Sequence, residues 1–190
     1  MASERSHEWL TEEHRLVRAA QDGDRPAFAA LVEHYWERLH RWLYRLTRDP
    51  HAAEDLAQEA FLKAFAHLDR FRPGTNFRAW LFRIAHNAFA NHHRARARQR
   101  ERLPGDLPAP ERGPVEEVLS HEALREVAEA VNALPVEFRA ALLLRVEEGL
   151  SFRQIAEVLD LTEETARWRV FKARHQLMAL LAPQLEREKP

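Results

Sequence analysis

The sequence predicts an all-α protein of two small helical domains joined by a Pro-rich linker, the second of which contains a helix-turn-helix. Hydrophobic residues make up 45% and charged residues 31% of the 190 residues, with only 5 glycines, a composition that favours helices over sheet or disorder. Apolar side chains recur at spacings of three and four along most of the chain. Proline and glycine gather instead in residues 103–115, which predicts a linker between residues 1–102 and residues 116–190.

The composition also excludes several classes of protein. The chain has no cysteine, so it forms no disulfide and offers no thiolate to a metal ion. No apolar run is long enough to cross a membrane, and the first residues lack the apolar segment of a signal peptide. We therefore expect a cytoplasmic protein with no membrane insertion.

The charges are distributed unevenly, although the formal net charge is only −1. A net charge near zero is unusual for a protein that binds nucleic acid. The chain nevertheless contains a basic run, formed by Arg94, Arg96, Arg98, Arg100 and Arg102, and an acidic block, formed by Glu116, Glu117, Glu122, Glu126 and Glu129. Such blocks predict one surface for phosphate groups and another for a basic partner.

Two helices are expected at the start of the chain, the second of them a core helix. The first covers residues 10–20, and a turn-forming segment follows it. Asp24 is placed to cap the second helix, which should extend to about Thr47. Its apolar residues form a continuous stripe at spacings of three and four: Phe28, Leu31, Val32, Tyr35, Leu39, Trp42, Leu43 and Leu46.

Two further helices complete the first domain. Asp49 and Pro50 open the third helix, expected over residues 51–71. A Pro-Gly loop covers residues 71–76, and the fourth helix begins at Phe77. The residues expected to be buried along this fourth helix are Phe77, Leu81, Ile84, Ala88 and His92.

Two polar surfaces on these helices are candidates for binding. The third helix carries an acidic face made of Glu54, Asp55, Gln58 and Glu59. The alternative to a binding role is that these acids offset the positive end of the helix dipole and keep the chain soluble, which is enough to explain acids considered alone. The fourth helix carries a strip of amides and guanidinium groups, Arg83, Asn87, Asn91 and Arg94. Such a strip can read unpaired bases and hold a nucleic-acid backbone, or it can be a solvated Arg-rich face.

A helix-turn-helix is predicted at residues 151–177. Ser151 and Gln154 form the pattern of a capping box at the start of its first helix. Asp160 ends that helix, and Thr162 is placed to cap the second one. The turn between the two helices is therefore very short, as the motif requires.

The second helix of this motif has two different faces. Its buried side comprises Ala166, Val170, Ala173 and Leu177. The other side gathers Arg167, Trp168, Phe171, Lys172 and His175. Cations and apolar groups together suit a recognition helix in the major groove of DNA. The alternative is a surface helix on which Trp168 and Phe171 pack against a neighbouring element.

Enzyme function has no support in the sequence. His86, His92 and His93 suggest a metal site, but His92 projects to a different side from the other two and no carboxylate stands at matching spacing. We find no arrangement of nucleophile and base and no Gly-rich phosphate loop. No catalytic residue, metal ion or cofactor is expected.

Four motifs resemble the extracytoplasmic-function group of bacterial sigma factors, within the sigma-70 family. The most specific is DPHAAEDLAQEAFLKAF at residues 49–65, which is similar to the family pattern D-P-x-x-A-E-D-L-x-Q-E-x-F. The others are FRAWLFRIAHNAFANHHR, LRVEEGLSFRQIAEVLDL and the final helix with its FKAR segment. They occur in the family's order around a Pro-rich linker, and the resemblance covers residues 28–181.

The resemblance implies a promoter-specificity subunit of RNA polymerase, with residues 1–102 as sigma region 2 and residues 116–190 as sigma region 4. Core polymerase would be contacted through its β′ coiled coil and its β subunit, the coiled coil by Glu54, Asp55, Gln58 and Glu59. The minus-10 element would be melted and held by Phe71, Arg72, Asn76, Arg83, Asn87, Asn91 and Arg94. The minus-35 duplex would be read by Arg167, Trp168, Phe171 and Lys172. An anti-sigma factor is an expected further partner.

Three positions depart from the family pattern, and three other interpretations of the chain stay open. Trp168 stands where a small serine is frequent, Ala166 where valine is frequent, and Asp160 where glycine usually makes the turn. The chain could instead be a sigma-like decoy that binds an anti-sigma factor without binding DNA. The other two alternatives are a helix-turn-helix repressor, in which the acidic face would have no role, and a metalloenzyme with histidine ligands.

Overall fold

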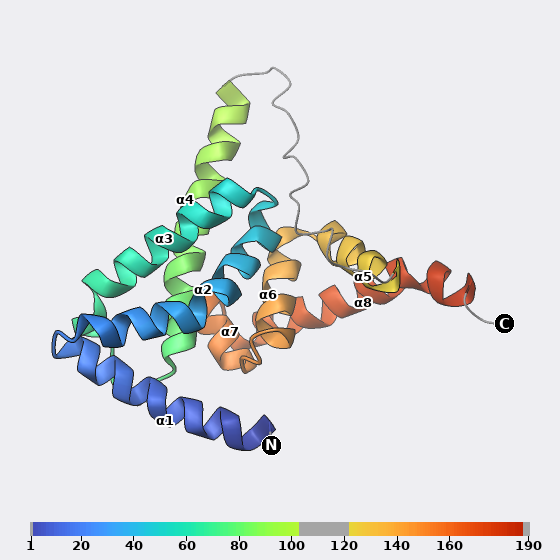
Figure 1. Ribbon diagram of the computed structural model, residues 1–190. Helices are drawn as coiled ribbons and strands as arrows, with labels where there is room; N and C mark the ends of the chain where they lie inside the picture. The colour runs from blue at the N-terminus through green and yellow to red at the C-terminus, as the bar shows by residue number, and fades with distance from the viewer. Residues whose placement is uncertain (1, 103–121, 188–190) are drawn as a thin grey trace.

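The chain is helical throughout the part that the computed structural model describes, residues 2–102 and 122–187, where eight α-helices and no strand are found (Figure 1). This confirms the predicted all-α class. No helix in these two ranges is long and apolar enough to cross a membrane. The helices are α1 (Ala2–Gln21), α2 (Arg25–Thr47), α3 (Pro50–Ala66), α4 (Phe77–Arg102), α5 (Glu122–Ala133), α6 (Val136–Val146), α7 (Phe152–Leu159) and α8 (Glu163–Arg187).

Helices α1 to α4 share an aromatic core. Trp42 of α2 is 1% exposed, and its ring lies 5.4 Å from that of Phe82 on α4. Phe77, the first residue of α4, is fully buried between Tyr35 and Phe71. The stripe predicted along α2 faces this core, since seven of its eight apolar residues are buried and Val32 packs at the edge.

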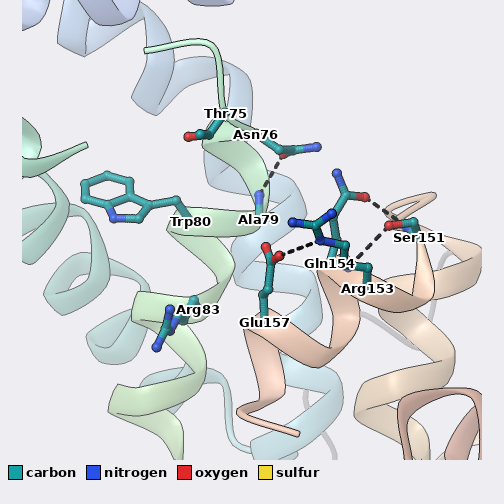
Figure 2. Close-up of a pocket in the computed structure, with 9 residues that line it drawn as sticks. All are labelled: Thr75, Asn76, Ala79, Trp80, Arg83, Ser151, Arg153, Gln154 and Glu157. Atoms are coloured by element: carbon teal, nitrogen blue, oxygen red, sulfur yellow. Dashed lines mark hydrogen bonds and ion pairs between the residues drawn. The ribbon is translucent and has the colours of Figure 1, made fainter. Parts of the chain in front are cut away.

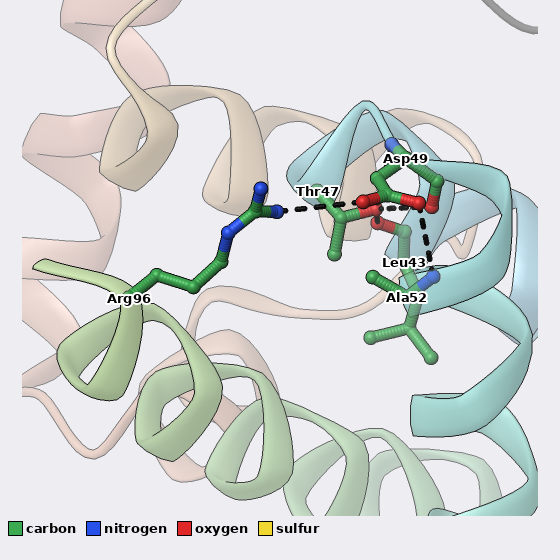
Figure 3. A network of polar contacts seen from close by, with 5 residues as sticks. All are labelled: Leu43, Thr47, Asp49, Ala52 and Arg96. Atoms are coloured by element: carbon green, nitrogen blue, oxygen red, sulfur yellow. Dashed lines mark hydrogen bonds and ion pairs between the residues drawn. The ribbon is translucent and has the colours of Figure 1, made fainter. Parts of the chain in front are cut away.

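Asp49 fixes the junction between α2, α3 and α4. Its carboxylate accepts a hydrogen bond from the backbone N–H of Ala52 at 3.1 Å, which caps α3, and it also pairs with Arg96 at 3.4 Å (Figure 3). The Thr47 hydroxyl donates to the Leu43 carbonyl at 3.0 Å and closes α2. Arg96 therefore holds α4 to α3, in addition to belonging to the basic run.

Three helix boundaries differ from the predictions. Helix α3 ends at Ala66, and a 3₁₀ turn at Leu68–Arg70 (η1) replaces the rest of the predicted helix. The amide of Gln21 explains this ending, because it donates to the carbonyls of Leu68 and Phe71, both at 2.8 Å, and ties the turn to the end of α1. Helix α1 starts earlier than predicted, and α8 continues past residue 177, where the predicted motif ends, to Arg187.

The predicted helix-turn-helix is formed by α7 and α8. Ser151 and Gln154 make both bonds of the capping box, at 3.2 and 2.9 Å. Asp160 ends α7 in the left-handed conformation with φ of 56°, and the hydroxyl of Thr162 accepts the N–H of Thr165 at 3.1 Å. These local signals placed the motif correctly because each acts within one helical turn.

The two groups of helices pack against each other. Helix α7 lies against α4, and α6 lies against α2 (Figure 1). Arg38 of α2 forms an ion pair at 2.8 Å with Glu148, which lies in the turn between α6 and α7. The predicted linker at residues 103–115 lies outside the described residues.

Candidate nucleic-acid and protein interfaces

The acidic face of α3 is exposed to solvent. Glu54, Asp55, Gln58 and Glu59 all point outward, because the opposite side of the helix carries the buried residues Ala53, Leu56, Ala57, Ala60 and Phe61. Gln58 donates to Glu54 at 3.4 Å, and Glu59 pairs with Lys63. The four predicted residues therefore form one continuous surface.

This surface also has an apolar floor, which the sequence reasoning did not identify. A hollow of about 450 Å³ is lined by Asp55, Gln58, Glu59, Leu62, Lys63 and Ala66. Leu62 is 70% exposed at its centre. The sequence does contain a signal for this apolar floor, because Leu62 lies outside the buried stripe of its helix and next to acidic residues. Acids around an exposed leucine suit a partner helix that is basic and partly apolar.

The loop at residues 71–76 is held by its own contacts. Phe71 is only 4% exposed, and its ring packs 5.5 Å from that of Phe77 and 5.2 Å from that of Trp80. Asn76 caps α4 by accepting the Ala79 N–H at 2.9 Å. In this arrangement Arg72 is exposed to solvent, whereas the ring of Phe71 is closed off from it.

The strip on α4 is exposed along its whole length. Arg83, Asn87, Asn91 and Arg94 all face solvent. Arg94 donates to the side chain of Asn91 at 2.7 Å and to the carbonyl of Ala90 at 3.2 Å, so its guanidinium lies along the helix. Amides and cations in this register can bind the phosphates and base edges of a single strand.

Trp80 extends this strip by one helical turn, and it was not among the residues predicted from the sequence. The indole is partly exposed and packs on Phe71 and Phe77 at its inner side. Figure 2 shows it projecting from α4 near Arg83. An aromatic face beside a cation is a stacking platform for an unpaired base. The spacing of three residues between Trp80 and Arg83 is the signal that could have placed both on one side of the helix.

Two of the residues predicted to read duplex DNA on α8 also make contacts within the protein. Arg167 donates to Glu163 at 3.0 Å and lies over the ring of Phe152 at 4.8 Å. Trp168 is 49% exposed and packs edge-on against Phe138 at 5.5 Å. Phe171 is 64% exposed, and Lys172 is exposed beside it. The face is therefore accessible and partly ordered by neighbours.

The buried side of α8 largely matches the prediction. Ala166, Val170 and Ala173 are at most 3% exposed, whereas Leu177 is only half-buried. On α4, Phe77, Leu81 and Ala88 are buried, and Ile84 and His92 are only partly so. Phe82 and Phe89 occupy the core beside them, because α4 packs on both α2 and α3.

No group of three or more histidine, aspartate or glutamate side chains within residues 2–102 and 122–187 could hold a metal ion. Burial lowers the pKa of His86, and nearby Arg169 lowers it further while Asp160 opposes the effect.

Comparisons with known proteins place the chain in a family. Sigma-70 region 2 matches residues 31–99, and sigma-70 region 4 matches residues 124–177. The RNA polymerase sigma-H factor of Pseudomonas aeruginosa is 37% identical, with 93% of this chain and 98% of that protein covered. The chain belongs to the extracytoplasmic-function group of the sigma-70 family. The sigma-E factor of Escherichia coli, from the same group, is 33% identical over 90% of this chain and 95% of its own length.

Solved structures of sigma factors share the fold. The sigma factor RpoE of Bartonella quintana, solved in complex with the anti-sigma factor NepR, matches with a TM-score of 0.71 and 28% identity over 82% of this chain and 96% of that one. CnrH, solved with the cytosolic domain of CnrY, matches with a TM-score of 0.67 and 27% identity over 90% of this chain and 98% of that one. The arrangement of α1 to α8 is therefore one found in sigma factors.

The family regions contain all the candidate surfaces of this sigma factor. The acidic face of α3, the loop at residues 71–76 and the strip on α4 lie within the region 2 match. The reading face of α8 lies within the region 4 match. Each surface was identified from its side chains, and each lies within one of the two matched regions.

Proposed function

We propose that this sigma factor binds core RNA polymerase through the acidic face of α3 and selects promoters through α4 and α8. The observation that carries the proposal is the presence of three chemically different exposed surfaces on one chain: acids around Leu62, an amide and cation strip beside Trp80, and a cationic and aromatic recognition helix. The first suits a basic protein partner, the second unpaired bases, and the third duplex DNA.

The minus-10 element would be opened and held along α4. A base leaves the duplex at a cost of a few kcal/mol, which the protein must offset by stacking and hydrogen bonding. Trp80 supplies a ring for stacking, and Asn87 and Asn91 supply amides for base edges. Arg83 and Arg94 add charge for the phosphates. Arg72, exposed in the loop before α4, completes the set.

The minus-35 element would be read by α8 in the major groove. Arg167 can donate two hydrogen bonds to guanine, and Phe171 can contact a thymine methyl group. Lys172 contributes phosphate contact without sequence preference. Residues 1–102 and 116–190 would act as two separate units on the polymerase. The linker between them would set their positions on its surface.

The chain would act as a regulatory subunit and would itself catalyse no reaction. Its place of action would be the cytoplasm, where bacterial RNA polymerase works. Because solved relatives are bound to anti-sigma factors, we infer that an anti-sigma factor also controls this chain. No cofactor is required for any of these contacts.

The test is transcription with purified components. The chain is mixed with bacterial core polymerase and fragmented genomic DNA, and transcript 5′ ends are mapped against those of core alone. New start sites that share two upstream elements are the expected result. Binding to core without initiation would favour a decoy. No binding to core, with binding to duplex DNA, would favour a helix-turn-helix repressor.

A further inference from the structure

One side chain of α1 holds the loop that precedes the minus-10 strip. Gln21 is the last residue of α1, and its amide nitrogen donates to the carbonyls of Leu68 and Phe71, both at 2.8 Å. These acceptors are the first residue of η1 and the residue just after it. An amide NH₂ carries two hydrogens, so this one group serves both carbonyls at once. Gln21 therefore fixes the backbone where the loop at residues 71–76 begins.

The amide of Gln21 is itself held in place by the turn that joins α1 to α2. Val17 and Ala20 are 1% and 7% exposed, and they anchor the end of α1 in the core. Gly23 then reverses the chain with φ of 95°, a conformation that glycine adopts without strain, and Asp24 caps α2 with its side chain. Figure 1 shows this turn beside the end of α3, where η1 follows. Gln21 is thus attached to a well-fixed corner of the core.

Phe71 passes this restraint on to the proposed minus-10 surface. Its backbone is extended, with φ of −70° and ψ of 130°, so successive side chains leave the chain on opposite sides. The ring of Phe71 turns inward, is 4% exposed and packs 5.2 Å from the ring of Trp80. Arg72 is directed to solvent. A shift of the backbone at this point would move both the cation of Arg72 and the inner support of Trp80.

The two ends of the loop are held in different ways. At its far end, the Thr75 hydroxyl donates to the Arg72 carbonyl at 2.8 Å, and Asn76 caps α4. The near end is held by Gln21, which lies 50 positions before Phe71. The sigma-70 region 2 match covers residues 31–99, so Gln21 lies before it. One support of the minus-10 loop therefore comes from outside the matched region.

We propose that Gln21 is a positioning residue for minus-10 recognition, and that α1 is thereby part of the base-selecting surface. The proposal rests on the function proposed above, because it concerns the same loop and strip. Without the amide, the carbonyls of Leu68 and Phe71 lose a donor, and the start of the loop is free to shift. An unpaired base then meets Trp80 and Arg72 at variable spacing, so the protein discriminates less between bases.

Hydrogen exchange on the full chain tests the positioning. Gln21→Met keeps the length of the side chain, removes both donors and adds no charge. Gln21→Glu keeps the shape but presents acceptor oxygens to the two carbonyls. Backbone amides at residues 67–77 should exchange roughly tenfold faster in both variants, the effect of losing one or two hydrogen bonds. Val17→Ala is the matched control, because it removes buried atoms from the same helix and keeps the amide of Gln21. Exchange at residues 67–77 should stay close to wild type in this control.

Promoter selection with holoenzyme tests the specificity. Core polymerase is combined with wild type, Gln21→Met or Val17→Ala and is given one promoter from the start-site mapping, with its minus-10 element randomised. In Gln21→Met, the preference for the favoured base should fall by roughly tenfold at one or two adjacent minus-10 positions, because stacking on an aromatic ring contributes on that scale. The minus-35 preference should not change. Val17→Ala should keep the wild-type preference at every position, whatever its total output.

Faster exchange with an unchanged minus-10 preference would reduce Gln21 to a structural contact and overturn the proposal. Unchanged exchange in both Gln21 variants would overturn it too, and so would a loss of transcription that is even over all sequences. Circular dichroism, together with exchange at residues 122–187, confirms that each variant is folded. If wild-type holoenzyme starts no promoter-specific transcript, the function proposed above fails instead. Hydrogen exchange then still decides whether Gln21 holds the loop.

Discussion

Trp168 of α8 packs edge-on against Phe138 of α6, with ring centroids 5.5 Å apart and an interplanar angle of 73°. The indole is nevertheless 49% exposed. The two interpretations open from the sequence, reading DNA or packing internally, therefore describe two sides of one ring. The inner edge is fixed by Phe138, and the outer edge stands beside Phe171 and Lys172 on the reading face.

Replacing Trp168 with serine should therefore have two effects. Loss of the ring pair should lower the free energy of unfolding by about 0.5–1.5 kcal/mol, measured by denaturant titration. Loss of the outer edge should alter the preferred minus-35 sequence, measured by selection from a randomised promoter pool. Phe138→Leu is the control, because it removes the same ring pair and leaves the reading face intact. An unchanged sequence preference in Trp168→Ser would remove this residue from the reading set.

Asp55→Arg should strongly weaken binding to core polymerase without unfolding the chain. Asp55 is exposed on α3 and lines the hollow around Leu62, so the new cation would repel a basic partner. The expected loss is about 2 kcal/mol or more of binding free energy, measured by fluorescence titration with core. Glu33→Arg on α2 makes the same charge change at an exposed position outside this face. Normal affinity in a folded Asp55→Arg chain would contradict the assignment.

Arg167 and Lys172 should behave differently when each is replaced by alanine. Glu163 and the ring of Phe152 hold the guanidinium of Arg167 in place, as a base-reading group requires. Arg167→Ala should cost about 1–3 kcal/mol at one minus-35 position and relax the preference there. Lys172→Ala should weaken binding to all sequences and reduce the salt dependence by about one counterion. Competition binding with single-base promoter variants, over a range of salt, separates the two results.

The parts of the fold that the sequence predicted are those set by neighbouring residues. Asp24, Asp49 and Ser151 cap their helices because a side-chain oxygen reaches an N–H three residues later. The buried stripe of α2 follows from helical periodicity alone. The exposed faces of α3, α4 and α8 were predicted for the same reason, as the positions left over by the apolar pattern.

The features that were missed depend on contacts between distant residues. The burial of Phe71 requires Phe77 and Trp80 to close over it, and the end of α3 depends on Gln21, which lies in another helix. The Arg38–Glu148 pair joins residues 110 positions apart. No pattern along a single sequence specifies such a pair, because periodicity assigns a residue to a face and leaves its partner open.

Asp160→Gly should stabilise the helix-turn-helix. Asp160 adopts φ of 56° at the end of α7, a left-handed conformation in which a side chain is strained and glycine is not. The free energy of unfolding should rise by about 0.5–1 kcal/mol. Gly149→Ala is the converse control. Gly149 has φ of +63°, and an added Cβ would meet nothing within 4 Å. The free energy of unfolding of this variant should therefore decrease through backbone strain alone. A loss of stability in Asp160→Gly would show that its carboxylate matters more than its backbone.

Acidification should lower the stability of the folded chain through His86. Burial lowers the pKa of this imidazole below its ordinary value of 6.5, nearby Arg169 of α8 lowers it further, and Asp160 opposes them. Its ring also lies 6.4 Å from that of Trp42, and its Nδ1 is buried without a partner. The folded chain therefore favours the neutral imidazole.

The sign of the pH effect follows from this lowered pKa. Above pH 6.5 the imidazole is neutral both folded and unfolded, so its contribution to stability is fully present. As pH falls below that value the unfolded chain takes up a proton first, and the contribution is lost until the folded pKa is reached. The pKa of His34 is likewise lowered, by burial and by Arg38 and Arg78, so His34 also contributes to the loss of folding stability at low pH. Thermal unfolding is measured at a series of pH values below 6.5. The melting temperature of His86→Gln should decrease less with falling pH than that of the wild type. An equal decrease in both proteins would exclude His86 as the group responsible.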